Sequence, residues 1–299
     1  MVQPSKYLNS LRSGYSFIIS AVTHYPFISG MPPAIGIELT NHCNLKCPEC
    51  PSGAGTMSRE RGFMDYRLFR KTVSELKPYL YNANLYFQGE PMMHPAFFDF
   101  LGYAAGTPTT VSTNGHFLSQ ENCRRLAESR LSRLIISLDG LDQATYSSYR
   151  KNGNIEKVLQ GIKDVSEAVR KASSKMKVEV QVLVNRNNES QIAEIKEFII
   201  SSGGRPVLKS MQIYEGSDYY GWMPADKKFS RYYLNDGNYL VRSSLPRRCL
   251  RLWFNPVVTW DGRVIPCCFD KDADHVMGNL ADESFREIWR GEKFKDFRK

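Results

Sequence analysis

Residues 40–51 read Thr40-Asn41-His42-Cys43-Asn44-Leu45-Lys46-Cys47-Pro48-Glu49-Cys50-Pro51 and contain three cysteines in the spacing C-x3-C-x2-C. This spacing is tight enough for one loop to surround a small inorganic cluster. A four-iron four-sulfur (4Fe-4S) cluster normally takes four cysteine thiolates, so three thiolates leave one iron without a protein ligand. A metal with an open position is typical of chemistry rather than of structural support.

Two other uses of these cysteines fit less well. A C-x2-C pair often belongs to a zinc site or a redox dithiol, but zinc needs a fourth ligand. His42 is a poor candidate because it directly precedes Cys43, and the loop offers no other histidine. Three close cysteines cannot all pair as disulfides, and no secretory signal precedes them. The spacing therefore favours an iron–sulfur cluster.

A short apolar strand, residues 34–39, leads directly into the three cysteines. Strand and motif together resemble the radical S-adenosylmethionine (radical SAM) superfamily. The resemblance implies that Cys43, Cys47 and Cys50 hold a 4Fe-4S cluster whose open iron is chelated by SAM. It further implies that the reduced cluster cleaves SAM to a 5′-deoxyadenosyl radical.

The composition is that of an ordinary globular protein. The 299 residues suffice for one large α/β domain and a smaller appendage. No apolar run approaches the roughly 18 residues that cross a membrane, and residues 17–22 are expected in a helix packed on the domain.

The net charge of +9 allows an acidic or phosphorylated partner, but the scattered basic residues argue against nucleic acid. Seven cysteines without an export signal predict a cytoplasmic protein that uses them for metal ligation rather than disulfides. The lack of a long apolar run predicts no membrane partner.

Strand and helix patterns alternate through the first two thirds of the chain. Strands are expected at 34–39, 84–87, 109–112, 134–138, 178–184 and 207–213, and helices at 65–80, 95–103, 119–129, 154–172 and 192–199. Short connections between such units predict a parallel sheet with right-handed crossovers. Six units fall short of a closed eight-fold barrel, and the radical SAM family has such a partial (β/α)6 barrel. We expect a lead-in at 1–33, a core domain at 34–215 and a small C-terminal domain at 216–299.

Polar or glycine-rich residues follow three of these strands, at 88–91, 112–115 and 137–140. Each segment alone could be a turn or a helix cap. Because ligands of parallel α/β folds bind at the carboxyl ends of the strands, the three segments and the cysteine loop together indicate a ligand site.

The resemblance gives these segments roles, although it assigns no side chain a direct catalytic role. Gln88-Gly89-Glu90-Pro91 resembles the family's Gly-Gly-Glu-Pro motif, which binds the SAM amino group, with Gln88 replacing the first glycine. The other residues whose positions match the family's SAM contacts are Glu49, Ser137, Gln181 and Met211, and those matching the substrate cavity are Thr113 and Asn114. Glu49 stands where the family has an aromatic residue, so ring stacking on the adenine is lost.

The α/β rhythm stops after residue 215. Residues 217–239 are expected to form an irregular connection, whose aromatic side chains pack between domains or cover the barrel mouth. Residues 257–265 predict a β-hairpin with an Asp261-Gly262 turn that brings Cys249 and Cys267 together. The hairpin, residues 277–280 and the helix after them resemble the SPASM or twitch extension of radical SAM enzymes, which holds an auxiliary cluster.

The auxiliary cluster would lack ligands. Relatives close this site with a further C-x2-C, whereas the sequence ends at Lys299, so we expect either a truncated sequence or an incomplete site. The candidates to complete the ligands of Cys249 and Cys267 are Cys268, Asp270, Asp272 and His275. Cys123 is expected to be a buried structural cysteine.

The resemblance predicts hydrogen abstraction from a small polar substrate, sugar-like or phosphorylated, with net oxidation. It also implies a low-potential electron donor similar to a flavodoxin or ferredoxin. A peptide maturase of the ribosomal-peptide or sulfatase type is the alternative, disfavoured because the short N-terminal segment offers no leader-binding domain. Two alternatives of another class are a non-catalytic iron–sulfur carrier or sensor and, more weakly, a zinc-stabilised binding module.

Overall fold

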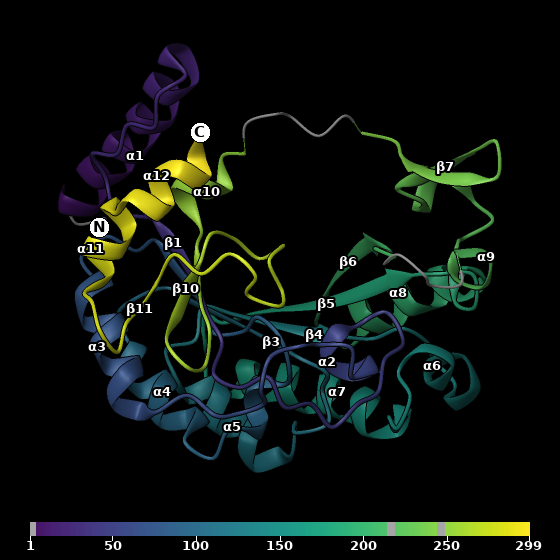
Figure 1. Ribbon diagram of the computed structural model, residues 1–299. Coiled ribbons are helices and arrows are strands. Elements are labelled where there is room, and N and C mark those ends of the chain that lie inside the picture. Colours follow the sequence, from purple (N-terminus) through teal and green to yellow (C-terminus); the bar gives the residue numbers. More distant parts are fainter. Residues whose placement is uncertain (1–3, 214–218, 244–248) are drawn as a thin grey trace. The chain divides into compact units, whose positions relative to one another are not determined.

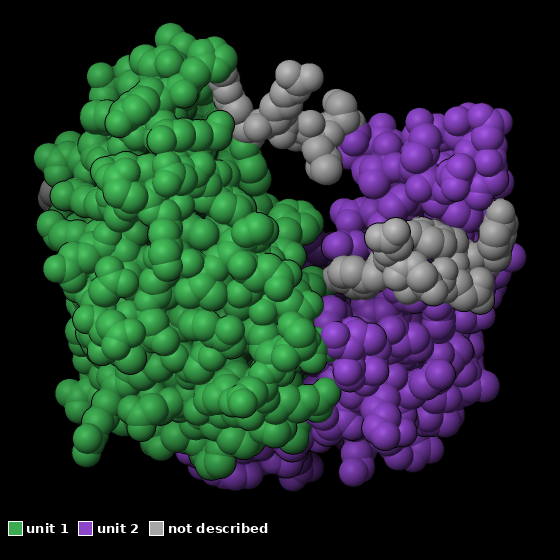
Figure 2. Space-filling model, in the orientation of Figure 1, with its two compact units in different colours: residues 1–42, 57–111, 247–299 green, residues 43–56, 112–246 purple. Residues whose placement is uncertain are grey.

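The computed structural model describes residues 4–213, 219–243 and 249–299. The chain forms two compact units (Figure 2). Unit 1 contains residues 1–42, 57–111 and 247–299, and unit 2 contains residues 43–56 and 112–246. Both units are mixtures of helices and parallel strands (Figure 1), as predicted from the sequence.

Unit 1 is built on a mostly parallel sheet. Its strands, in spatial order, are β11 (Gly278–Asn279), β10 (Arg263–Ile265), β9 (Val257–Val258), β1 (Ala34–Ile37), β2 (Asn82–Asn84) and β3 (Thr109–Thr113). β1 pairs in parallel with β2 and with β9, while β9, β10 and β11 are antiparallel. The predicted hairpin is therefore confirmed, and Gly262 in its turn has φ +86°. The hairpin extends the sheet past β1 instead of forming a sheet of its own.

The helices of unit 1 are α1 (Pro4–Thr23), α3 (Tyr66–Leu76), η1 (Pro91–Met93), α4 (Phe97–Ala104), α10 (Arg251–Phe254), α11 (Phe285–Arg290) and α12 (Glu292–Arg298). Asp65 caps α3 as predicted, since its side chain accepts hydrogen bonds from the backbone N–H groups of Arg67 and Leu68. α3 packs on α4 through the rings of Phe69 and Phe100, whose centroids are 4.5 Å apart. Across the described residues, no helix combines the length and the apolar character needed to cross a membrane.

Unit 2 contains three parallel strands, β4 (Arg133–Ser137), β5 (Lys177–Val184) and β6 (Arg205–Ser210). Its helices are α2 (Pro51–Ala54), α5 (Gln120–Glu128), α6 (Gln143–Tyr149), α7 (Ile155–Lys171), η2 (Glu189–Gln191), α8 (Ile192–Ser201), α9 (Tyr219–Trp222) and η3 (Lys227–Phe229). Ser119 and Asn154 cap α5 and α7 through their side chains. α7 buries Val158, Ile162 and Val165, which the helical spacing had predicted.

Several local predictions were wrong. The sixth strand, expected at 207–213, is β6 at Arg205–Ser210. α3 ends at Leu76 rather than at Leu80. β2 spans Asn82–Asn84 instead of the expected residues 84–87, because pairing with β1 and β3 outweighs the intrinsic strand preference of Leu85, Tyr86 and Phe87. Part of the connection predicted as irregular is an antiparallel hairpin, β7 (Tyr232–Asn235) and β8 (Asn238–Val241), closed by Asp236 and Gly237 at positive φ. The Asp-Gly pair was the available hairpin signal. Residues 214–218 of that connection lie outside the described residues.

Candidate functional site

The three motif cysteines lie in one tight loop of unit 2. Cys47 is buried and Cys43 and Cys50 are half-buried, all as free thiols. α2 starts directly after Cys50, whose carbonyl accepts a hydrogen bond from the N–H of Ala54 at 2.7 Å. A Cβ on Gly53 would lie 2.6 Å from the backbone nitrogen of Cys47, so the loop closes on itself only with glycine there.

A buried guanidinium stands beside Cys47. Arg150 Nη1 lies 3.7 Å from the Cys47 sulfur, and Arg150 Nε donates to Asp139 Oδ2 at 2.5 Å. Burial raises the pKa of the Cys47 thiol, while the charge of Arg150 opposes the rise. Burial would lower the pKa of Arg150, but Asp139 and Cys47 hold it well above its usual value. This arrangement keeps a positive charge next to the Cys47 sulfur.

Asn114, predicted in the substrate cavity, contacts the cysteine loop. Its Nδ2 lies 3.9 Å from the Cys43 sulfur and donates to Asn44 Oδ1 at 2.7 Å. Thr113 is buried, and its hydroxyl accepts from the N–H of Gly115 at 3.1 Å. The end of β3 therefore supports the loop directly, a role that sequence reasoning missed.

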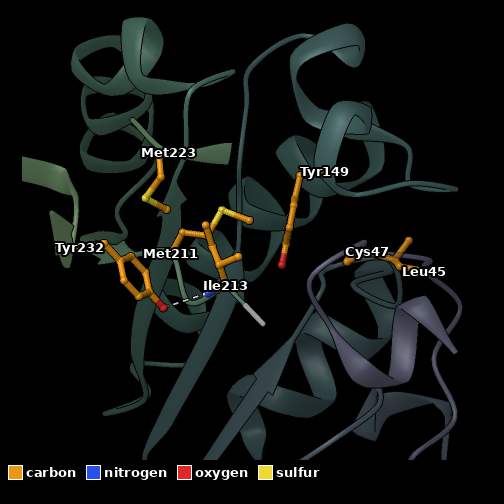
Figure 3. Packing of buried hydrophobic residues seen from close by; sticks show 7 residues of the cluster. All are labelled: Leu45, Cys47, Tyr149, Met211, Ile213, Met223 and Tyr232. Atoms are coloured by element: carbon orange, nitrogen blue, oxygen red, sulfur yellow. Dashed lines mark hydrogen bonds between the residues drawn. The ribbon is translucent and has the colours of Figure 1, made fainter. Parts of the chain in front are cut away.

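A buried apolar cluster forms one side of the cysteine loop (Figure 3). Its residues are Leu45, Cys47, Tyr149, Met211, Ile213, Met223 and Tyr232, with Cys43 and Cys50 packed against it. Met211, a predicted SAM contact, is 1% exposed and thus shares the buried environment of Cys47. An apolar wall of this kind excludes water from a metal site and controls its local dielectric.

The donor set fits an iron–sulfur cluster better than a preformed metal-ion site. Among the residues that the structure describes, no three His, Cys, Asp or Glu side chains are gathered around one metal position. Three thiols on one loop, a neighbouring cation and an apolar wall instead match the ligation of iron–sulfur clusters, which use cysteine thiolates. Cys43, Cys47 and Cys50 are the residues that would hold it.

Gly89 and Glu90 lie against the backbone that precedes the cysteines. Gly89 has φ +75°, and a Cβ there would come within 2.6 Å of the carbonyl oxygens of Thr40 and His42. The N–H of Glu90 donates to the His42 carbonyl at 2.8 Å, and its carboxylate caps η1 through the N–H of Met92. Glycine is required at position 89 because the two loops pack closely there. This requirement is separate from any contact with a ligand.

Ser137 and Gln181 are brought together by the sheet of unit 2. They are register partners on β4 and β5, and both are half-buried. Glu49 is 8% exposed. Asp139, two residues beyond Ser137, accepts from the N–H of Leu183 at 2.7 Å as well as from Arg150. Asp139 and Arg150 were not predicted as site residues, although Asp139 lies in one of the polar strand ends.

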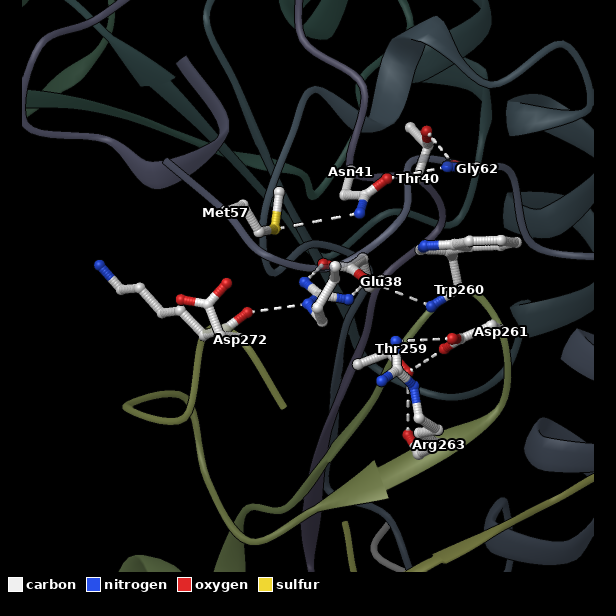
Figure 4. Close-up of polar contacts among 12 residues, drawn as sticks. Glu38, Thr40, Asn41, Met57, Gly62, Thr259, Trp260, Asp261, Arg263 and Asp272 are labelled. Atoms are coloured by element: carbon white, nitrogen blue, oxygen red, sulfur yellow. Dashed lines mark hydrogen bonds and ion pairs between the residues drawn. The ribbon is translucent and has the colours of Figure 1, made fainter. Parts of the chain in front are cut away.

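A buried ion pair links both flanks of the cysteine motif within unit 1 (Figure 4). Arg59 donates to both carboxylate oxygens of Glu38 at 2.8 Å. The backbone N–H of Trp260 also donates to Glu38, at 3.2 Å, and Arg59 Nε donates to the carbonyl of Lys271 at 2.9 Å. The segments before and after the motif are thus tied to the C-terminal hairpin region.

The three C-terminal cysteines all lie in unit 1 as half-buried free thiols. Burial raises the pKa of the Cys267 thiol. Arg251 Nη1 donates to the Cys268 sulfur at 3.2 Å. Among the described residues these thiols are not gathered around one metal position, so their role as ligands of a second cluster stays a prediction.

The other residues considered as ligands make different contacts. Asp272 accepts hydrogen bonds from the backbone N–H and hydroxyl of Ser58, and Asp270 accepts from the N–H groups of Asp274 and His275. Cys123 is buried as predicted, and burial raises the pKa of its thiol to about 12, which suits a structural role.

Comparison with known protein families assigns the two regions. Residues 37–199 match the family model of the radical SAM superfamily. Residues 249–299 match the SPASM model, described as an iron–sulfur cluster-binding domain.

The chain is similar over most of its length to two curated proteins. It is 26% identical to a tungsten-containing aldehyde ferredoxin oxidoreductase cofactor-modifying protein of Pyrococcus furiosus, covering 88% of this chain and 82% of the relative. It is 25% identical to an AdoMet-dependent heme synthase of Methanosarcina barkeri, covering 91% and 85%. Among solved structures, Streptococcus suis SuiB bound to S-adenosylmethionine superposes with a TM-score of 0.70 at 13% identity, covering 94% of this chain and 70% of SuiB.

Proposed function

Because this chain belongs to the radical SAM superfamily and carries a SPASM iron–sulfur domain, we propose that it is an oxidoreductase acting on a small polar substrate, sugar-like or phosphorylated. The observation that carries the proposal is the loop of Cys43, Cys47 and Cys50 beside a buried guanidinium and an apolar wall. Both curated relatives are named for small-molecule chemistry, cofactor modification and heme synthesis, which favours a small substrate over a peptide. The domain boundaries at 33/34 and 215/216 belong to the same proposal.

A 4Fe-4S cluster with SAM supplies one-electron chemistry that removes a hydrogen atom from an unactivated C–H bond. In this chain Cys43, Cys47 and Cys50 would hold the cluster. The residues proposed to bind SAM are Glu49, Gly89, Glu90, Ser137, Gln181 and Met211, and those proposed to line the substrate cavity are Thr113 and Asn114. The low-potential electron donor is proposed to resemble a flavodoxin or ferredoxin.

Four residues prepare the loop for this role. Asp139 fixes Arg150 through its carboxylate, and Arg150 places its charge beside the Cys47 sulfur. Asn114 holds the Cys43 end through Asn44. Tyr149, 4% exposed, contributes to the wall that keeps water from the loop.

The second cluster is proposed to be held by Cys249 and Cys267, with Cys268 as a third thiolate. Its chemical contribution would be an electron acceptor, which makes a net oxidation possible. Arg251 beside Cys268 supplies a compensating positive charge.

Anaerobic cleavage of SAM tests the proposal. The protein is reconstituted with iron and sulfide, mixed with SAM and dithionite, and 5′-deoxyadenosine is quantified. We expect release by the wild type and by Cys123→Ala, which removes a buried cysteine outside the loop, and none by the Cys43→Ala/Cys47→Ala/Cys50→Ala variant. A fully loaded wild type that releases none would refute the enzyme proposal in favour of an electron carrier. Release that rises only with added peptides, and not with sugars or their phosphates, would favour a maturase.

A further inference from the structure

Unit 2 contains a cavity of about 290 Å³ whose lining is strongly basic. Three cations and three tyrosines contribute to it: Arg186, Lys227, Arg242, Tyr232, Tyr233 and Tyr239. None of the described residues that line it is acidic. A concave surface that gathers three positive charges without a carboxylate is suited to an anion.

The basic residues come from separate elements at a site where parallel folds bind ligands. Arg186 lies just beyond the carboxyl end of β5, and Arg242 directly follows β8. Lys227 belongs to η3. Because loops at the carboxyl ends of parallel strands form the ligand sites of such folds, the position of Arg186 agrees with a binding role.

Both arginines are held in place through Nε, and no hydrogen bond with a described residue engages their terminal nitrogens. Arg186 Nε donates to the carbonyl of Met223 at 3.0 Å, and Arg242 Nε donates to the carbonyl of Tyr232 at 2.9 Å. Within the described part of the chain, no carboxylate forms an ion pair with either guanidinium or with Lys227. The nearby Asp226 pairs with Lys228 instead. Pre-positioned guanidinium groups are well suited to bidentate binding of phosphate.

The cavity shares its wall with the cysteine loop. Met223 and Tyr232 line the cavity and also belong to the apolar cluster that contains Cys47 and Met211 (Figure 3). The hydroxyl of Tyr232 accepts a hydrogen bond from the N–H of Ile213 at 3.1 Å, which fixes the ring. A charged group bound in the cavity would therefore be anchored on the same buried cluster as the loop.

We propose that this cavity binds the phosphate group of a phosphorylated small-molecule substrate, with Arg186, Arg242 and Lys227 as its ligands. The inference rests on the proposed function and names the substrate class. The volume of about 290 Å³ lies at the lower limit of small-molecule sites, which suits the charged end of a metabolite better than a peptide chain.

Binding of inorganic phosphate tests the proposal without turnover. The reconstituted protein is titrated with phosphate by calorimetry at low ionic strength, in the absence of SAM. We expect saturable binding that Arg186→Gln/Arg242→Gln weakens at least tenfold. The matched control is Lys175→Gln/Lys196→Gln, which removes the same charge from exposed positions of unit 2 and should leave binding unchanged.

The outcomes distinguish failure of the proposed phosphate site from failure of the proposed enzyme activity. Absent phosphate binding, or an equal loss in the control variant, would overturn the phosphate site, and so would tighter binding of citrate than of phosphate, which would indicate a carboxylate ligand. SAM cleavage is measured in parallel on the same preparations. Cleavage without phosphate binding would refute the site alone, and phosphate binding without cleavage would refute the proposed function alone.

An independent observation concerns α1, whose amphipathic character is inverted. Its polar residues face the protein: the Asn9 side chain bonds both backbone groups of Met31 at 2.8 and 2.9 Å, and Ser16 and Ser20 accept from backbone N–H groups of residues 29 and 27. Figure 1 shows α1 beside α10. Helices normally bury their apolar face instead.

The outer face of α1 is apolar, and we name five of its residues the α1 seam: Leu8, Leu11, Tyr15, Ile18 and Val22. Their exposed fractions run from 48% to 72%. The spacing alternates between three and four residues, which is the heptad pattern of one helix packing on another. The prediction that residues 17–22 belong to a helix packed on the domain is thus confirmed, while the outer face of that helix stays exposed.

The α1 seam fits a second copy of itself. It is nearly symmetric about Tyr15, since Leu8 and Val22 lie seven residues to either side, Leu11 four residues before and Ile18 three residues after. An antiparallel copy would therefore place Leu8 against Val22 and Leu11 close to Ile18. α1 contains no acidic residue and two basic ones, of which Lys6 is buried, so it lacks the many cations of helices that bind anionic lipid. We infer that α1 forms a two-fold symmetric antiparallel dimer. α1 has 20 residues and is about 30 Å long. An interface limited to this helix buries less area than a standard interface, which buries about 800 Å² per partner. The association should therefore be reversible.

Sedimentation of the reconstituted protein over a concentration series tests the dimer. We expect a monomer–dimer equilibrium that Leu11→Glu/Ile18→Glu abolishes. Ile200→Glu is the matched control, because Ile200 is 62% exposed on α8 and Ile18 is 58% exposed. Tyr15→Cys should form an interchain disulfide under mild oxidation, whereas Leu8→Cys should give no more than the wild type. A monomer at every concentration would overturn the inference, and binding to phosphatidylcholine–phosphatidylglycerol vesicles by that monomer would assign the seam to a lipid surface.

Discussion

Arg59 and Glu38 form a fork-shaped ion pair, with two N–O distances of 2.8 Å and side-chain exposures of 1% and 0%. Glu38 precedes the cysteine motif and Arg59 follows it. The ion pair therefore joins the two chain segments that flank the motif, both of which belong to unit 1. Buried charges are costly unless paired, and here Trp260 and Lys271 complete the hydrogen bonding.

Removing one partner of this pair should destabilise the protein strongly. Arg59→Met leaves the Glu38 carboxylate buried without its cation, and a broken buried pair typically costs about 3–5 kcal/mol. The free energy of unfolding is measured by urea denaturation. The double variant Glu38→Met/Arg59→Met removes both charges and should be less destabilised than the two single variants added together. Additive losses would show that the two residues do not act as a pair.

Gly89 and Gly55 offer a comparison of two positive-φ glycines. Both have nearly the same φ, +75° and +74°, but a Cβ on Gly55 meets nothing within 4 Å while one on Gly89 meets three backbone atoms. Gly55→Ala should therefore cost only the left-handed conformation, about 1–2 kcal/mol. Gly89→Ala should cost clearly more and displace the backbone before Cys43. The melting temperatures of both variants test this comparison. Equal losses of stability would show that close backbone contacts around Gly89 add no cost to the substitution.

The lowered pKa of the Asp142 carboxylate predicts how the stability of unit 2 changes in acid. The backbone N–H of Thr145, then the side chains of Gln191 and Thr145, lower its pKa to about 2. An unfolded aspartate titrates at about 3.9, so the folded pKa is depressed and the stabilisation is present above that value. It is lost as the pH falls from about 4 to about 2.

Asp142→Asn should therefore lower the urea midpoint at neutral pH and lose less stability on acidification than the wild type. The two midpoints should converge as the pH approaches the folded pKa. Midpoints measured as a function of pH for both proteins test this, and a constant difference across the whole range would contradict it.

The local features of the fold could be predicted, because they depend on neighbours in sequence. Asp65, Ser119 and Asn154 cap helices where their side chains reach the next free N–H groups. The cysteine spacing and the Asp261-Gly262 turn are equally local. Such patterns also carry the family resemblance.

The contacts that assemble the candidate site could not be predicted in this way. The pairing of β9 with β1 and the approach of Arg150 to Cys47 join residues far apart in the chain. The periodicity of the sequence predicts neither contact, because both depend on how helices and strands that are distant in sequence pack together. The inward serines of α1 are a further case, since their partners are backbone groups of a separate turn.

Asp139 and Arg150 give the most direct test of how the chain supports its proposed cluster. In Asp139→Asn the amide can still accept from Leu183, but it no longer neutralises the guanidinium that stands 3.7 Å from the Cys47 sulfur. Loss of a residue that orients a metal ligand typically reduces metal affinity or activity by about 10–100-fold. We therefore expect less iron retained per chain after desalting, an altered electron paramagnetic resonance spectrum and slower SAM cleavage.

The matched control for that variant is Asp142→Asn, which changes the same residue type three positions further along the chain. Asp142 caps α6 through Thr145 and also accepts from Gln191, so its described partners do not include Arg150. It should retain wild-type iron and the wild-type spectrum, whatever its effect on acid stability. Asp139→Asn with wild-type iron content and cleavage rate would show that Arg150 keeps its place without the carboxylate. The Arg150–Cys47 contact would then depend on the packing of Tyr149, over whose ring the guanidinium lies at 5.4 Å, rather than on charge.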